Sequence, residues 1–292
     1  MLLALAGAAT ASAAQTAATD AGIAGEWIFE MTGDAQPQRV VLQLVGDTLR
    51  GRVYGQELTG RVLGSRVEFR VGSYRWRAAL RGDTLTGWLG VDPDSSAWRG
   101  TRFRRPAVPR RFEFTPTSWE RGVSATVRPV LRVAPGDTVR TSTLDAGGWS
   151  TGAFGERGNR PSPGGNPLVG PFYVEGAVPG DVLVLRLHRV RLNRTWAFSG
   201  TELIDQAVDQ GYARDRKYAN TDNKWTLDTA TATARLTTPT PALKDWRVPL
   251  RPFLGVVAVA PSQQFTPSSR DAGSYGGNME SAHLAEGAVV YL

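Results

Sequence analysis

The sequence predicts a mainly β protein, with a small N-terminal β-barrel or β-sandwich followed by a longer part that is also built mostly of strands. Glycine and proline account for 33 and 18 of the 292 residues, which is typical of short strands joined by tight turns. Several stretches alternate apolar and polar residues, as strands with one buried face do. The hexapeptide GDTLRG at 46–51 returns as GDTLTG at 82–87, and each copy indicates a hairpin turn between two strands.

The first residues have the features of a secretory signal. Residues 2–14 are apolar or small and end in Ala11-Ser12-Ala13-Ala14, which fits an apolar core followed by a cleavage site, although no positively charged residue precedes them. Residues 1–14 are therefore predicted to be a signal peptide, and the mature protein is predicted to be secreted or periplasmic. No later stretch is apolar over enough residues to cross a bilayer, so no membrane span is predicted.

Residues 21–105 are predicted to form a small all-β domain. In residues 74–81, Trp76 and Ala78 fall on one face of a strand while Arg75 and Arg77 fall on the other. We expect the domain to bury five aromatic side chains, namely Trp27, Phe29, Phe69, Trp76 and Trp88. This part of the chain contains no histidine and no carboxylate cluster, so no chemistry is assigned to it.

The chain is basic, with a net charge of +7 that arginine carries almost alone, because Lys217, Lys224 and Lys244 are the only lysines. A basic protein can bind nucleic acid, but here the arginines alternate along predicted strands instead of clustering. A solvated sheet face is therefore favoured over a phosphate-binding patch, and no nucleic-acid partner is predicted. The absence of cysteine excludes disulfides, thiolate metal ligands and cysteine nucleophiles.

A second domain is predicted over residues 112–292, because the two prolines and four arginines of residues 104–111 do not suit a core. It begins with strands near 127–133 and 138–144, and a glycine-rich loop follows at 146–165. Loops of that length are usually functional or disordered. The capping box Ser199-Gly200-Thr201-Glu202 predicts a helix that stops at Gly211.

The stretch 165–181 contains the first candidate site. Glu175 follows a short apolar strand held between Gly-Pro and Pro-Gly pairs, which suits a positioned acid or metal ligand and equally a solvated hairpin residue. Pro179-Gly180-Asp181 repeats the sequence of Pro135-Gly136-Asp137, so Asp181 has an alternative role as a turn residue. Asp145 lies in no such repeat. Carboxylates with few histidines suit a hard or borderline divalent metal that polarises a carbonyl and activates water.

Gly148-Trp149-Ser150-Thr151-Gly152 matches the G-x-S-x-G pattern of a serine nucleophile. That motif requires a strand before it and a helix after it, and the surrounding glycine-rich loop provides neither. The chain order Ser150, Asp181, His283 would permit a triad, so a serine hydrolase is kept as the least favoured function.

Two further features lie near the C-terminal end. His283 follows Asn278-Met279-Glu280 and is a candidate for a shared pocket, whereas His188, the only other histidine, is expected to be structural. The backbone N–H groups of Gly276-Gly277-Asn278 fit an oxyanion site or, equally well, a plain tight turn.

Three blocks of the second domain resemble the acetamidase/formamidase family. Residues 166–181, NPLVGPFYVEGAVPGD, resemble its GP-(I/F)-Y-V-E-G-A-x-P-G-D block. Residues 251–261, RPFLGVVAVAP, resemble its P-F-x-G-V-I-G-V-A-P strand, and residues 276–280, GGNME, resemble its G-G-N-M-D turn. The blocks occur in the family's order within residues 112–292, while residues 21–105 lie outside the resemblance.

The resemblance implies a jelly-roll-like sandwich with a small α/β subdomain. It also implies hydrolysis of short carboxamides, such as acetamide and formamide, to the acid and ammonia, with a bound divalent metal that is zinc or similar. The implied metal ligands are Asp145, Glu175 and Asp181. The implied catalytic residues are Glu175, Glu280 and Asn278, and the implied substrate-binding residues are Gly276, Gly277, Asn278 and His283.

Two departures from the family pattern motivate an alternative. Glu280 stands where the family has aspartate. The family also continues past V-Y-L into a G-D-G-H-A-x-Q-G-D-G-E block, which this sequence, ending at Leu292, does not contain. The chain is therefore expected to be an incomplete fragment, and the sequence leaves open whether it is active without that block. The alternative function is an exported protein that binds a ligand without hydrolysing it. The sequence leaves open whether the chain forms a homo-oligomer.

Overall fold

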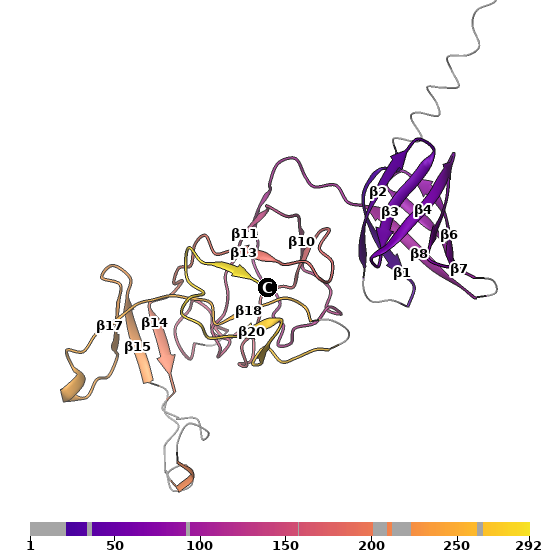
Figure 1. The fold of residues 1–292 in the computed structure, drawn as a ribbon. Helices are drawn as coiled ribbons and strands as arrows, with labels where there is room; N and C mark the ends of the chain where they lie inside the picture. Colours follow the sequence, from indigo (N-terminus) through magenta and orange to yellow (C-terminus); the bar gives the residue numbers. More distant parts are fainter. Residues whose placement is uncertain are drawn as a thin grey trace, which may run out of the picture. The chain divides into compact units, whose positions relative to one another are not determined.

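The computed structural model describes residues 22–33, 37–91, 94–156, 158–200, 209–211, 223–261 and 265–292 (Figure 1). The predicted signal peptide lies outside the described residues, as do residues 201–208, which make up most of the helix predicted to stop at Gly211, so both remain predictions. The chain divides into two compact units, which are described separately. The first unit comprises Met1–Glu113, Val127–Arg140 and Pro171–Asp181, and the second comprises Phe114–Thr126, Thr141–Gly170 and Val182–Leu292. No helix within the described ranges is long and apolar enough to span a membrane.

The first unit contains a closed barrel of eight antiparallel strands, coloured indigo to purple in Figure 1. Each strand pairs with the next, and β8 closes the barrel against β1, where Trp27 lies opposite Arg102. The strands are β1 (Gly25–Met31), β2 (Gln38–Val45), β3 (Thr48–Val53), β4 (Gln56–Leu63), β5 (Arg66–Val71), β6 (Tyr74–Arg81), β7 (Thr84–Val91) and β8 (Asp94–Arg102). The repeated hexapeptides form the β2–β3 and β6–β7 turns, as predicted.

The barrel interior is filled by side chains from its own strands. Phe29 and Trp98 pack with ring centroids 4.7 Å apart, and Phe69 stacks on Trp76 at 5.4 Å. Such aromatic contacts contribute to stability beyond the apolar area that they bury. The predicted burial of Trp88 is wrong, since 61% of this residue is exposed. Alternation along β7 turns its neighbours Leu85 and Gly87 inward and leaves Trp88 on the outer face.

The remaining strands of the first unit form two small parallel sheets. Strand β10 (Leu131–Val133) pairs with β12 (Phe172–Val174), with Arg132 opposite Tyr173. Strand β11 (Thr138–Arg140) pairs with β9 (Arg111–Glu113). Strands β10 and β11 are shorter than the predicted strands at 127–133 and 138–144, and prolines at 129 and 135 flank β10.

The second unit consists of three small antiparallel sheets and long connections within the part that the structure describes. One sheet pairs β13 (Val184–Arg186) with β21 (Val289–Tyr291). A second contains β14 (Trp196–Ser199), β15 (Asn223–Asp228), β16 (Thr233–Leu236) and β17 (Val248–Pro249). The third has the order β18 (Val256–Ala258), β20 (Gly276–Asn278), β19 (Ala272–Gly273). The predicted mainly β fold is confirmed.

Candidate functional site

Two asparagine side chains join separate blocks of the second unit. Asn166 Nδ2 donates a hydrogen bond to Asn278 Oδ1 over 3.0 Å, and Asn278 Nδ2 donates to the carbonyl oxygen of Arg270 over 3.2 Å. Antiparallel pairing of β18 with β20 places Val256 opposite Asn278. Parts of all three sequence blocks, from Asn166, from β18 and from β20, therefore meet at one place.

The backbone at this place is strained. Asn166 has a φ of +55° and Glu280 a φ of +46°, which makes them two of the four non-glycine residues with positive φ in the described part of the chain. Asparagine tolerates this left-handed region, but glutamate adopts it only at a cost in free energy. Conformations of this kind persist where the surrounding contacts impose them, and they concentrate at functional sites.

Three hydrogen bonds impose the conformation of Asn166. The backbone N–H groups of Gly165 and Asn166 both donate to the carbonyl oxygen of Ala146, over 2.9 Å and 3.3 Å. The fully buried Ser269 hydroxyl donates to the carbonyl oxygen of Gly165 over 2.9 Å. The amide side chain of Asn166 is therefore directed by its backbone before any ligand arrives.

Glu280 follows Asn278 on the same turn and is exposed to solvent. Its backbone N–H donates to the carbonyl oxygen of Gly255 over 3.0 Å. A Cβ atom at Gly255 would lie 2.7 Å from Glu280 Oε1, so the absence of a side chain there lets the carboxylate approach the chain. Water can reach this carboxylate, as a general base requires.

The predicted oxyanion role of the Gly276-Gly277-Asn278 backbone is only partly available. The backbone N–H of Asn278 already donates to the carbonyl oxygen of Asp271 over 2.8 Å, and Gly276 and Gly277 are buried in β20. Each side-chain amide of the asparagine pair has a second hydrogen that no described residue accepts. Side-chain amides are therefore better placed than the backbone to bind a substrate oxygen.

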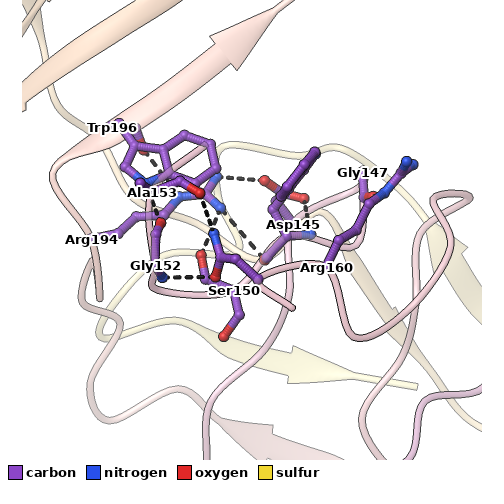
Figure 2. A network of polar contacts seen from close by, with 10 residues as sticks. Asp145, Gly147, Ser150, Gly152, Ala153, Arg160, Arg194 and Trp196 are labelled. Atoms are coloured by element: carbon purple, nitrogen blue, oxygen red, sulfur yellow. Dashed lines mark hydrogen bonds and ion pairs between the residues drawn. The ribbon is translucent and has the colours of Figure 1, made fainter. Parts of the chain in front are cut away.

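Figure 2 shows a second polar network, centred on Arg194, that holds the 146–165 loop. Arg194 Nη2 donates to Asp145 Oδ2 over 2.5 Å, and its guanidinium carbon lies 3.8 Å from the centroid of the Trp196 ring. Trp196 Nε1 donates to the carbonyl oxygen of Gly152 over 2.7 Å. Asp145 also accepts the backbone N–H of Trp149 over 2.9 Å, so its carboxylate is engaged on both oxygens.

Glu175 and Asp181 lie in the first unit and contact arginines there. Glu175 is 3.7 Å from Arg132 Nε and 4.0 Å from Arg110 Nη2. Asp181 Oδ2 accepts Arg39 Nη2 over 2.8 Å and also the backbone N–H of Val178 over 3.0 Å. That second bond closes the Pro-Gly-Asp turn, which agrees with the turn role considered for Asp181.

Each of the three predicted metal ligands is already paired with an arginine of its own unit. Asp145, Glu175 and Asp181 each lie beside an arginine, whose positive charge opposes a second cation at the same oxygens. No group of three His, Asp or Glu side chains in the described ranges is arranged to hold a metal. Metal binding therefore stays a prediction of the family resemblance.

The serine and histidine candidates have few contacts. Ser150 lies in a loop with neither a strand before it nor a helix after it, and no described residue hydrogen-bonds its hydroxyl. His188 and His283 are both exposed. Within the described residues His283 is held only through its backbone N–H, which donates to Ser281 Oγ over 3.3 Å.

The sequence reasoning gave no role to Asn166, Gly255, Ser269 or Arg194. One signal could have identified Asn166, since asparagine tolerates a positive φ better than other non-glycine residues. The roles of Ser269 and Arg194 depend on contacts with residues more than 40 positions away, which no local pattern reveals.

Comparison with known proteins gives one family. The model of the acetamidase/formamidase family matches residues 123–291, more than half of the chain. No curated protein matches the chain. Among solved structures, the chain is similar to the crystal structure of an acetamidase from Bacillus halodurans. The two share 22% identity over 62% of this chain and 56% of that chain, with a TM-score of 0.46.

Two further solved structures are similar to the same extent. One is a predicted acetamidase/formamidase from Thermoanaerobacter tengcongensis, with 22% identity, coverage of 63% and 56%, and a TM-score of 0.49. The other is an acetamidase from Yersinia enterocolitica, with 20% identity, coverage of 63% and 56%, and a TM-score of 0.49. The chain thus spans a little over half the length of each of these proteins.

Proposed function

The chain belongs to the acetamidase/formamidase family, and on that basis we propose that it hydrolyses the carbon–nitrogen bond of short linear carboxamides at Asn166, Asn278 and Glu280. The observation that carries this proposal is the convergence of the family-like blocks on the asparagine pair. A primary carboxamide has the same donors and acceptor as an asparagine side chain. A site built from interlocked side-chain amides is therefore suited to bind one.

The asparagine pair binds and orients the substrate in this proposal. The second Nδ2 hydrogens of Asn166 and Asn278 donate to the substrate carbonyl oxygen. These donors are fixed in advance by the contacts of Asn166 with Ala146 and of Asn278 with Arg270, so they stabilise the negative charge that grows on that oxygen without reorganising.

Glu280 acts as the general base. Its carboxylate takes a proton from a water molecule while the water oxygen bonds to the carbonyl carbon. The carbon–nitrogen bond then breaks, the proton passes to the leaving nitrogen, and the products are a carboxylic acid and ammonia. Metal assistance, which the family resemblance implies, enters none of these steps, and metal analysis of the purified chain with and without a chelator tests it directly.

Ammonia release from acetamide and formamide tests the proposed function. Glu280→Gln should lower turnover by about 100-fold or more, the usual contribution of a general base. Asp245→Asn is the matched control, because it removes an 86% exposed carboxylate of the same unit. Asn166→Gly, which preserves the positive φ and removes the amide, should raise KM and lower kcat.

Three outcomes would contradict the proposal. Unchanged turnover in Glu280→Gln would remove the general base, and lost turnover in Ser150→Ala would favour a serine hydrolase. Ligand binding without ammonia release by the unmodified chain would favour the non-hydrolysing binding protein.

A further inference from the structure

The barrel gathers arginines that are dispersed along the sequence. Strands β3 to β6 carry eight arginines against two acidic residues, Glu57 and Glu68, which gives these strands a net charge of +6 in a chain whose total is +7. All eight arginines are exposed. They are Arg50, Arg52, Arg61, Arg66, Arg70, Arg75, Arg77 and Arg81, and we call their surface the arginine face.

Strand register places these charges close to one another. Arg70 of β5 lies directly opposite Arg75 of β6, and Thr59 of β4 separates Arg70 from Arg50 of β3. Neighbouring strands are about 4.8 Å apart, and alternate residues of one strand about 7 Å apart. Like charges directly opposite each other destabilise a sheet. Glu68 of β5 lies opposite Arg61 and Arg77, and among the described side chains of this face the one ion pair within 4.0 Å is Arg52–Glu57.

The fold does not need this charge. The apolar core of the barrel lies on the other face of every strand, with Leu49, Leu58 and Phe69 among its buried residues. Arg70 and Arg75, which lie directly opposite each other, therefore cost free energy in the unliganded barrel, and a bound polyanion would remove that cost. We propose that the arginine face binds an acidic polysaccharide through its carboxylate or sulfate groups.

The chemistry of the face favours this partner. A guanidinium forms two parallel hydrogen bonds with a carboxylate or sulfate, and this face carries arginine with no lysine. Trp88 of β7, 61% exposed, lies opposite Arg77 and provides a ring on which the apolar side of a sugar can pack.

The shape of the arginine face disfavours two other negatively charged partners, an anionic lipid surface and single-stranded nucleic acid. The outside of a closed barrel is convex, so a flat lipid surface meets few of these arginines at once, whereas a flexible chain can follow all four strands. Single-stranded nucleic acid is usually bound in a groove with aromatic rings interleaved among the cations. On strands β3 to β6 the arginines alternate with buried residues, and Trp88 lies at the margin.

Binding of the intact chain to heparin and polygalacturonate tests the proposal, with a plain sulfonate cation exchanger as the reference matrix. The chain should require more salt for elution from heparin than from the sulfonate resin. In the triple variant Arg61→Gln, Arg70→Gln, Arg75→Gln, the affinity for heparin should fall by about tenfold or more. Its dependence on salt should also be smaller, because fewer counterions are released. A second triple variant, at Arg50, Arg66 and Arg77, should behave in the same way if the first fails to fold.

The matched control changes Arg128, Arg186 and Arg235 to glutamine, which removes the same charge from exposed positions off the face. Equal losses in control and face variants would overturn the proposal. Equal elution of the unmodified chain from heparin and sulfonate resin would also overturn it. Tighter binding to single-stranded DNA or to phosphatidylglycerol vesicles than to either polysaccharide would assign the face to those partners instead.

Discussion

Asp137 is the carboxylate whose ionisation is tied most closely to the fold. Its side chain is 1% exposed and accepts hydrogen bonds from the backbone and guanidinium of Arg110 and from the backbone N–H of Ala134, over 2.7 to 3.0 Å. Burial raises the pKa of Asp137, but these hydrogen bonds outweigh burial and lower the pKa from 3.8 to about 2.

A pH dependence of stability follows from this pKa. Because the pKa is lower in the folded than in the unfolded chain, Asp137 stabilises the fold fully above pH 3.8 and loses that contribution as the pH falls towards 2. Asp137→Asn should reduce the free energy of unfolding by about 2 kcal/mol at neutral pH, as expected for hydrogen bonds to a charged group. Denaturant titrations from pH 7 to pH 2 should show the difference shrinking, while an equal difference at every pH would contradict the assignment.

The chemistry of single residues was harder to predict from sequence than their positions. The repeated Pro-Gly-Asp sequence predicts that Asp137 and Asp181 each lie in a turn. Each carboxylate does accept a hydrogen bond from the backbone N–H of the residue three positions earlier. The sequence did not show that Asp137 is buried against Arg110, since that contact joins residues 27 positions apart. Asp145 is predicted as a metal ligand, but its carboxylate pairs with Arg194. That residue lies just before β14, 49 positions along the chain, so no local pattern showed the pair.

At the scale of elements, Arg194 fixes the 146–165 loop to the sheet that begins with β14. Its side chain is 12% exposed and that of Asp145 is 20% exposed, so the ion pair is largely shielded from water. Arg194 also donates to the carbonyl oxygens of Trp196, Trp149 and Ser150. The loop leads through Ala146 to Asn166, so the same contacts position the candidate site.

Removing this guanidinium should therefore loosen the loop. We expect Arg194→Ala to reduce the free energy of unfolding by about 3 kcal/mol, because it leaves the shielded Asp145 carboxylate unpaired. Limited proteolysis should then cleave within residues 146–165. Arg194→Lys should rescue only part of the loss, because an ammonium cannot reproduce the planar fork.

A double-mutant cycle decides whether the pair acts as a unit. Asp145→Asn combined with Arg194→Ala should cost less than the sum of the two single changes. Arg235→Ala, an exposed arginine of β16, should leave the proteolysis pattern unchanged. Additive losses would show that Arg194 stabilises the loop through its carbonyl contacts and the Trp196 ring instead.

Strand pairing separates what local patterns can predict from what they cannot. The alternation in residues 74–81 and the repeated hexapeptides predicted the hairpins of the barrel, because those signals are contained within a few residues. The same alternation made the arginines look dispersed, since their grouping depends on the register of four strands. The parallel pairing of β10 with β12 joins residues 41 positions apart and had no local signal.

At the scale of the whole molecule, the barrel has what it needs to fold without the rest of the chain. Each of its eight strands pairs through backbone hydrogen bonds with two neighbours in the closed barrel, and its core consists of residues from Ile23 to Trp98. Within the first unit, residues 171–181 contact residues 22–105 through Arg39, which bonds Asp181 and the carbonyl oxygen of Gly176, and through the ring of Phe103, which lies against Gly176. Partly exposed contacts of this kind contribute about 1 kcal/mol or less.

Residues 22–105 expressed alone should therefore give a β-type circular dichroism spectrum and one cooperative thermal transition. Loss of the Arg39 contacts should lower its Tm by at most about 8 °C relative to the barrel transition of the full chain, since 1 kcal/mol shifts a domain of this size by about that much. Arg39→Ala in the full chain is the matched control and should reproduce the part of the shift that comes from these contacts. An unfolded fragment would show that the barrel depends on residues 127–140 or 171–181, which would make the first unit a single cooperative body and not a barrel with attached segments.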